Sequence, residues 1–130
     1  MDYEKSLNDL EKILDDLRDK NNEIPILVEG DKDIEALKKI NINGIILSFN
    51  KGMSVTNFCD LIAKKYDKII ILTDWDKKGG QLCYNLKKNL IGRVDCITDY
   101  RKKIAQKTTI KTVEGLPSWI DTIKNKINHL

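Results

Sequence analysis

Short runs of apolar residues alternate along the chain with longer segments in which apolar residues recur every three or four positions. The short runs are typical of buried strands, and the longer segments are typical of amphipathic helices that bury one face. Pro117, at a first-turn position, begins the last helix. Strands are expected at 24–28, 44–48, 68–73 and 93–97, and helices at 3–20, 32–40, 55–65, 79–89 and 117–127, whereas residues 98–115 fit neither pattern clearly.

This alternation favours an α/β fold with a mainly parallel, four-stranded sheet that has helices on both faces and right-handed crossovers. We expect the strand order 2-1-3-4, chosen partly because it places the end of strand 24–28 beside the end of strand 68–73. Residues 1–22 then form an N-terminal amphipathic helix, and residues 23–130 form the domain with its C-terminal helix. In the helix 55–65 the side chains expected to face the core are Val55, Phe58, Leu61 and Ile62.

Acidic residues follow two of the expected strands directly. Glu29-Gly30-Asp31-Lys32-Asp33 comes after strand 24–28, and Asp74-Trp75-Asp76 comes after strand 68–73. Open α/β sheets bind their ligands outside the carboxyl ends of the strands, so we expect these acids to meet there. Carboxylates gathered in one place repel each other unless a cation binds among them, and their oxygens suit Mg²⁺ or Mn²⁺. The pattern predicts a divalent-metal site for phosphate chemistry.

Each acid has more than one possible role. Asp74 and Asp76 are two residues apart where the chain leaves its strand, so both can reach one metal ion, directly or through water. Glu29 can complete the metal site or serve as general acid and base, because crowding by other acids raises the pKa of a carboxyl group. Asp31 and Asp33 precede or begin a helix, and such residues are more often helix caps than ligands.

Glycines and an aromatic residue surround these acids. Gly30 and Gly79 would let the backbone approach a phosphate closely, and the helix starts after Asp33 and Gly80 would add N–H donors. Trp75 is either a platform on which a base stacks or a side chain packed against the rim of the sheet.

The formal charge of +3 is unevenly distributed along the chain. Residues 1–76 have a net charge of −5 and residues 77–130 one of +8. A basic surface attracts nucleic acid through the release of counterions, and a solvated lysine-rich face is the simpler alternative. The basic residues that could form the surface are Lys77, Lys78, Lys87, Lys88, Arg93, Arg101, Lys102, Lys103, Lys107 and Lys111.

The composition argues against several other classes of protein. The three cysteines are an odd number without CxxC spacing, which favours reduced, buried thiols over disulfides or a zinc site. His129 is the only histidine, and no serine or cysteine is paired with a base, so a catalytic triad or a zinc hydrolase is excluded. Neither a bilayer-spanning apolar stretch nor a signal-peptide pattern is present, so we expect a single cytoplasmic domain.

The two acidic segments resemble a known pair of motifs. Val28-Glu29-Gly30-Asp31-Lys32-Asp33 is similar to the EGxxD signature of the Toprim domain, and Asp74-Trp75-Asp76-Lys77-Lys78-Gly79 is similar to its DxDxxG signature. Topoisomerases, bacterial primases and several nucleases share this domain, among them the ribonuclease that matures 5S ribosomal RNA. The order and separation of the motifs also match, with a glycine-bearing loop at Gly52 between them. The resemblance covers residues 24–97.

The resemblance implies a Rossmann-like three-layer fold with the 2-1-3-4 sheet, as in small stand-alone Toprim proteins of archaea and bacteria. It also implies that Glu29 is the acid/base residue and that Asp74 and Asp76 bind Mg²⁺. The N-terminal helix 3–20 departs from that ribonuclease, in which the core begins near the start of the chain. The residues expected to contact phosphate or nucleic acid are Gly30, Asp33, Lys51, Gly52, Lys77, Lys78 and Gly79.

Three functions remain open from the sequence. The leading hypothesis is a Mg²⁺-dependent nuclease, a hydrolase that processes RNA or cleaves DNA, with Mn²⁺ as an alternative ion. The second is a non-catalytic module that binds nucleic acid, as a homodimer or within a larger complex. The third is a phosphoacceptor of the receiver type at Asp74, ranked last because no clear lysine ends a fifth strand.

Overall fold

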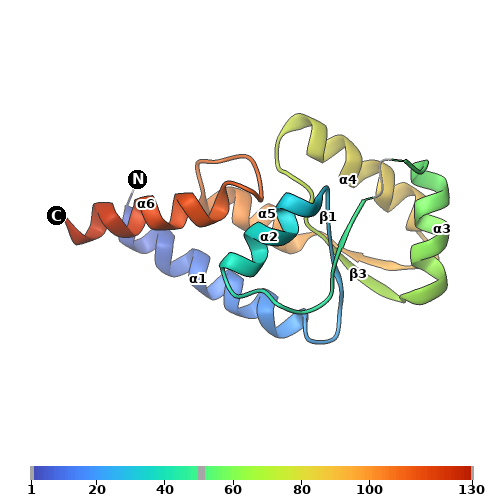
Figure 1. Ribbon diagram of the computed structural model, residues 1–130, viewed down its shortest axis with the longest axis horizontal. Helices are drawn as coiled ribbons and strands as arrows, with labels where there is room; N and C mark the ends of the chain where they lie inside the picture. The colour runs from blue at the N-terminus through green and yellow to red at the C-terminus, as the bar shows by residue number, and fades with distance from the viewer. Residues whose placement is uncertain (1, 50–51, 130) are drawn as a thin grey trace.

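The computed structural model describes residues 2–49 and 52–129 (Figure 1). Strands and helices alternate through most of this part of the chain, and two helices follow one another at its end. The elements are α1 (Tyr3–Lys20), β1 (Ile26–Val28), α2 (Asp31–Lys39), β2 (Ile46–Ser48), α3 (Val55–Lys65), β3 (Lys68–Ile71), α4 (Lys77–Leu90), β4 (Asp95–Ile97), α5 (Asp99–Lys107) and α6 (Leu116–Asn128).

The strands form one parallel sheet in the order β2-β1-β3-β4, which confirms the expected α/β class and strand order. Ile26 of β1 pairs with Ile46 on one side and with Ile70 on the other. Alternate side chains of a strand point to opposite faces, so the continuously apolar β1 and β3 supply two hydrophobic cores. These two central strands end next to each other at the same edge of the sheet.

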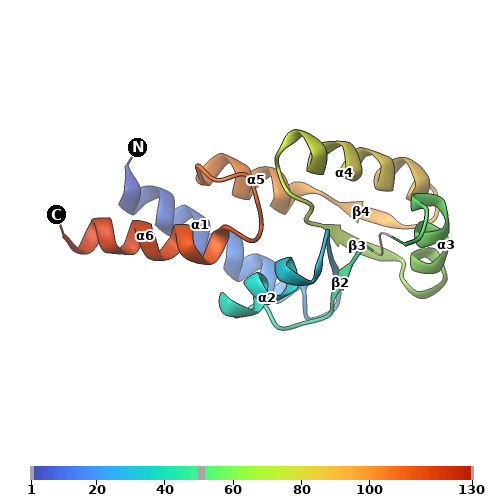
Figure 2. The ribbon, with the colours of Figure 1, turned by 45° about the horizontal axis from the view of Figure 1, so that its top comes forward.

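Two helical layers cover the two faces of the sheet, which gives the three layers expected from the sequence (Figure 2). Ile26 and Ile70 face a core shared with α1, α2, α5 and α6. Leu27 and Ile69 face a second core, shared with α3 and α4. None of the helices in the described residues is long and apolar enough to cross a membrane.

Helix α1 belongs to the first of these cores. Its leucines at positions 7, 10, 14 and 17 are buried against α5 and α6, as their spacing predicts. The carboxylate of Asp2 accepts a hydrogen bond from the backbone N–H of Lys5 at 3.1 Å and so caps the helix. The start of α1 lies beside the end of α6, where the Lys126 ammonium is 3.3 Å from the hydroxyl of Tyr3.

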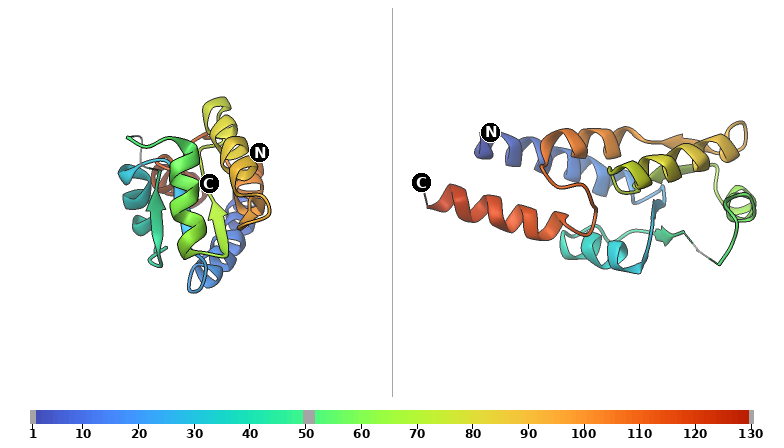
Figure 3. Two further views of the ribbon diagram at one scale, coloured as in Figure 1. Left: turned by 90° about the vertical axis from the view of Figure 1, so that its right-hand side faces the viewer. Right: turned by 90° about the horizontal axis from the view of Figure 1, so that it is seen from above.

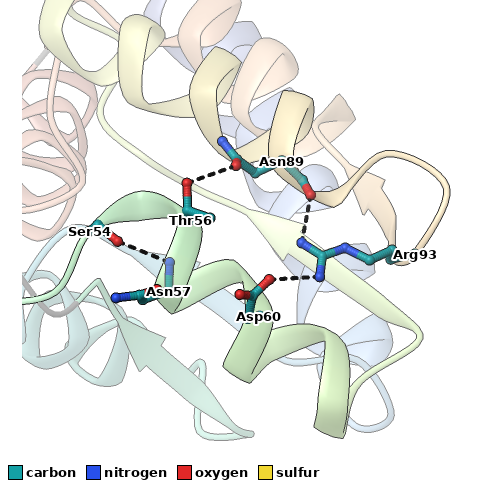
Figure 4. Close-up of polar contacts among 6 residues, drawn as sticks. All are labelled: Ser54, Thr56, Asn57, Asp60, Asn89 and Arg93. Atoms are coloured by element: carbon teal, nitrogen blue, oxygen red, sulfur yellow. Dashed lines mark hydrogen bonds and ion pairs between the residues drawn. The ribbon is translucent and has the colours of Figure 1, made fainter.

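Hydrogen bonds and an ion pair between polar side chains link α3 to α4 (Figure 4). Arg93 contacts the Asp60 carboxylate at 2.8 Å and also donates to the backbone carbonyl of Asn89 at 2.8 Å. Leu61, on the same helix as Asp60, is 46% exposed, so its expected place in the core is wrong. The buried face of α3 is formed by Phe58 and Ile62 with Cys59, and Leu61 falls beside that stripe.

Candidate functional site

Glu29 and Asp74 lie together at the carboxyl ends of the two central strands. Glu29 directly follows β1, and Asp74 comes three residues after the end of β3. The backbone N–H of Asp74 donates a hydrogen bond to Oε2 of Glu29 at 2.8 Å. Because β1 and β3 are neighbours, the strand order itself brings these acids from distant parts of the sequence into contact.

The Asp74 carboxyl group is strongly perturbed by this environment. Burial raises its pKa to about 7, against an ordinary value of 3.8, and the negative charges of Glu29 and Asp33 add to the rise. One hydrogen bond acts in the opposite direction, because the backbone N–H of Val113 donates to Asp74 Oδ1 at 2.8 Å. A half-buried carboxyl group whose pKa is raised to about 7 can hold and release a proton near neutral pH, or accept a cation in its place.

Asp33 is a third acid close enough to act on this pair. Its carboxylate accepts a hydrogen bond from the backbone N–H of Gly30 at 3.1 Å and so closes the first turn of α2. Its side chain is buried, and burial raises its pKa, with further contributions from the charges of Glu29 and Glu114. The expectation that Asp33 caps a helix agrees with this geometry, while its contribution to phosphate binding remains a prediction.

Asp76 has a structural role in addition to the metal binding expected for it. Its Oδ1 accepts a hydrogen bond from the backbone N–H of Gly79 at 2.7 Å, which makes it the N-cap of α4. Across the described residues, no group of three or more acidic, histidine or cysteine side chains is assembled as a metal cluster. The structure therefore pairs Glu29 with Asp74, whereas Asp76 binds the start of its own helix.

Gly79 packs directly against the backbone of the site. The hydroxyl of Thr73 donates to the carbonyl oxygen of Gly79 at 2.8 Å, which holds the start of α4 against the loop after β3. A Cβ atom at position 79 would fall well inside 3.0 Å of the carbonyl oxygen of Asp74. Only glycine fits there, so this position fixes the backbone that presents Asp74.

The other residues expected to contact phosphate surround the acid pair less closely. Lys77 and Lys78 are exposed at the first turn of α4. A side chain added at Gly30 would meet no atom within 4 Å, so the space beside this backbone is open. Gly52 is exposed in the turn before α3, and Lys51 lies outside the described residues. Their contacts with phosphate remain predictions.

Arg101 was counted in the sequence only as part of the basic surface, although it contacts the site backbone. Its guanidinium donates to the carbonyl oxygen of Asp74 at 2.7 Å and to that of Thr73 at 3.1 Å. The chain has only three arginines, and the other two, Arg18 and Arg93, also donate to backbone carbonyls. In this lysine-rich chain, each of the three arginines therefore forms a fixed contact with a backbone carbonyl, which the forked guanidinium suits better than an ammonium group.

The segment 108–115, which had no clear sequence pattern, lies against the loop that bears Asp74. Besides the bond from Val113 to Asp74, the backbone N–H of Trp75 donates to the carbonyl of Lys111 at 2.9 Å. The indole N–H of Trp75 donates to the carbonyl of Ile110 at 2.6 Å. The half-buried Trp75 is thus packed at the rim of the sheet, which was the second of its two expected roles.

Comparison with known proteins places this arrangement in a family. The family model of the Toprim domain matches residues 24–107, which contain both acidic motifs. The chain belongs to the Toprim domain family. Residues 108–115 and α6 lie outside the matched range, so the donor that Val113 supplies to Asp74 is an addition to the Toprim core.

Several relatives are similar over most of their length. The UPF0292 protein of Thermoplasma volcanium is 42% identical over 78% of this chain and 86% of its own length. The UPF0292 protein of Thermococcus sibiricus is 36% identical over 88% of this chain and 90% of its own. A solved structure of a protein from Aquifex aeolicus matches with a TM-score of 0.69 and 25% identity, over 80% of this chain and 94% of that one. The Toprim match associates the chain with divalent metals and nucleic acid.

The acid pair of this Toprim domain has the properties that a divalent cation requires. Glu29 and Asp74 offer hard oxygen ligands, and their mutual repulsion, which helps to raise the pKa of Asp74, would be relieved by a cation between them. Asp76 uses Oδ1 to cap α4, and a carboxylate has a second oxygen that can bind a metal. These residues fit a hard divalent ion such as Mg²⁺ or Mn²⁺.

The raised pKa of Asp74 predicts how the stability of the metal-free protein depends on pH. In the unfolded chain this carboxyl ionises near pH 3.8, whereas in the folded protein it keeps its proton until about pH 7. Between these values the folded state binds more protons, so its stability relative to the unfolded state falls as the pH rises. Relative to Asp74→Asn, we expect the unfolding free energy of wild type to fall by about 3 kcal/mol between pH 4 and pH 8. The amide oxygen of the asparagine can still accept the hydrogen bond from the Val113 N–H.

Chemical denaturation of both proteins in EDTA across this pH range measures the difference. Asp33 also has a raised pKa and is present in both proteins, so the comparison isolates the titration of Asp74 together with its interaction with Asp33. A difference in unfolding free energy that stays constant with pH would show that Asp74 ionises normally in the folded protein.

Proposed function

We propose that this protein is a small Mg²⁺-dependent nuclease of the Toprim type that cleaves phosphodiester bonds in RNA or DNA. The observation that supports the proposal most directly is the contact between Glu29 and Asp74 at the carboxyl ends of β1 and β3. Ligand sites of parallel α/β sheets lie at this edge, and a carboxyl group with a raised pKa, here that of Asp74, is typical of a functional site.

In this proposal Glu29 moves the proton on its second carboxylate oxygen, Oε1, because Oε2 accepts the hydrogen bond from the Asp74 N–H. Proton transfer from a positioned side chain to the leaving oxygen accelerates such reactions by roughly 10²–10⁴-fold. Asp74 and Asp76 hold the ion, which when bound neutralises charge that develops on the phosphate oxygens. Arg101 keeps the backbone of Asp74 in place through its carbonyl oxygen, and Gly79 leaves room for that backbone.

The surroundings of the acid pair also suit a phosphate. The exposed Lys77 and Lys78 stand at the N-terminus of α4, where the helix dipole adds positive potential. The space beside the Gly30 backbone is open. Together these features favour a polyanionic substrate whose backbone passes beside Glu29.

A second candidate is a Toprim module that binds nucleic acid without cleaving it. One observation favours this candidate: Asp76 caps α4, and the described residues form no three-acid metal cluster. Such a module would retain the basic surface and a weakened affinity for the ion. It would act on its partners through binding alone.

Metal dependence distinguishes the two candidates. The pure protein is incubated with end-labelled structured RNA, single-stranded RNA and DNA of mixed sequence, each with Mg²⁺, with Mn²⁺ and with EDTA. We expect several turnovers of at least one substrate with either ion and no product in EDTA. If the protein binds the same substrates in a salt-dependent way but forms no product in any condition, the nuclease is refuted and the non-catalytic module is supported.

A further inference from the structure

A groove runs along α4 from Trp75 towards the far end of the helix. Its first part, a cavity of about 1020 Å³, lies between α4 and α5 and is lined by Trp75, Tyr84 and Lys87. Its second part, about 770 Å³, lies between the C-terminal half of α4 and β4. Tyr84 and Lys87 line both cavities, so the two cavities adjoin at these side chains. In Figure 3 (right), α4 is seen alongside the segment of β4 and α5. We call this feature the α4 groove.

The α4 groove is strongly basic. The carboxylates in its lining are those of Asp95 and Asp99. Lys87 and Lys102 are exposed, and neither forms an ion pair with a carboxylate in the described part of the chain. Their charges are available to neutralise phosphates. The basic side chains of its lining are Lys87, Lys88, Arg93, Arg101, Lys102 and Lys103.

An aromatic ring and an aliphatic side chain interrupt these charges. Tyr84, where the two parts of the groove meet, is 60% exposed, and Ile91 is 80% exposed. An exposed ring beside basic side chains can stack on a base while the charges bind the backbone phosphates. A base in a duplex is already stacked on its neighbours, whereas an unpaired base can stack on an exposed ring. A tyrosine among lysines therefore suits a single strand better than a double helix.

The near end of the groove adjoins the loop that bears Asp74. Trp75, at this end, follows Asp74 directly in the chain. Arg101 lines the same end and binds the carbonyl oxygen of Asp74. A strand lying in the groove would therefore pass from Tyr84 to the backbone of Asp74.

We propose that the α4 groove binds single-stranded nucleic acid, with one base stacked on Tyr84 and with Lys87 and Lys102 on adjacent phosphates. This inference rests on the proposed function and adds the class of substrate to it: an unpaired strand or the unpaired end of a structured one. The bound strand enters along α4 and reaches Glu29 at the carboxyl ends of β1 and β3.

The test measures binding without metal, so that cleavage does not contribute. Fluorescently labelled single strands of about 12 nucleotides, one RNA and one DNA, are titrated by anisotropy in EDTA, together with a duplex of the same length. We expect tighter binding of at least one single strand than of the duplex. Tyr84→Ala should weaken single-strand binding about tenfold, and Tyr84→Phe, which keeps the ring, should largely restore it.

The charges are tested through salt dependence. For Lys87→Ala/Lys102→Ala we expect the slope of log affinity against log salt to fall by roughly 1.4, which corresponds to two lost phosphate contacts on a single strand. The matched control is Lys38→Ala/Lys39→Ala, which removes two exposed charges from the last turn of α2 and should leave both affinity and slope unchanged. Tyr84 is exposed, so its variants should fold as wild type does.

Three results would overturn the groove assignment. The first is that Tyr84→Ala and the double lysine variant both bind single strands with the same affinity as wild type. The second is binding of the duplex as tight as that of the single strands, insensitive to Tyr84. The third is self-association that Tyr84→Ala abolishes while oligonucleotide binding persists, which would make the groove a protein interface. In each of these cases the protein could still cleave nucleic acid with metal, so these results would not refute the proposed function. The proposed function is refuted by a different result, the absence of any metal-dependent product.

Discussion

Glu29→Gln is expected to reduce the rate of nucleic-acid cleavage by roughly 10²–10⁴-fold, the usual loss when a general acid or base is removed. Glutamine is close to glutamate in size, and its amide oxygen can still accept the hydrogen bond from the Asp74 N–H. The local fold should therefore survive, while the exchangeable proton is lost. Single-turnover cleavage assays with Mg²⁺ measure the rate, and anisotropy in EDTA measures binding of the same substrate, which should remain close to that of wild type.

The matched control for this substitution is Glu35→Gln. Glu35 is exposed on α2, so the variant makes the same glutamate-to-glutamine change away from the acid pair. Its activity should equal that of wild type. Equal activity of Glu29→Gln and wild type would refute the acid/base role, and a parallel loss of substrate binding would mean that Glu29 acts in binding instead.

Gly79→Ala is expected to destabilise the protein by at least about 2 kcal/mol and to abolish metal-dependent cleavage. The added methyl group would overlap the carbonyl oxygen of Asp74, so the start of α4 would have to move away from the loop after β3. That movement would break the bond from Thr73 to the Gly79 carbonyl and the cap from Asp76. Chemical denaturation measures the loss of stability, and the cleavage assay measures the loss of activity.

The adjacent glycine gives the opposite expectation. An alanine Cβ at position 80 would meet only Arg101 Nη2, at the ordinary contact distance of 3.5 Å. Glycine inside a helix costs up to about 1 kcal/mol relative to alanine, so Gly80→Ala should leave stability unchanged or raise it. If the two variants had the same unfolding free energy, the close packing of α4 on Asp74 would not exist in solution.

The sheet and the proximity of two acids could be predicted from the sequence. The first depends on the local pattern of apolar residues, and the second on the rule that ligand sites lie at the carboxyl ends of parallel strands. Continuous apolar runs identified β1 and β3 as buried strands of a parallel sheet, and the strand order was chosen partly because it brings their acidic ends together. The structure has both this order and the contact between Glu29 and Asp74. No long-range detail was needed for this part of the site.

Other features were missed because they depend on distant partners. Nothing near Val113 indicates that its N–H meets Asp74, 39 positions earlier in the chain. Arg101 likewise binds backbone carbonyls that no periodicity can reveal. The cap formed by Asp76 was open to prediction, since an aspartate three residues before Gly79 in a helix start is a common N-cap, but the metal interpretation was preferred.

The bonds from residues 110–113 to the loop at Asp74 have a consequence for how the protein can be divided. A fragment limited to 24–107 would leave the Asp74 carboxylate without one of its donors and would open the first core, which includes Leu14 and Trp119. The region that defines family membership is therefore smaller than the unit that folds cooperatively. A shortened version of this chain that keeps the surroundings of Asp74 intact has to retain both terminal helices.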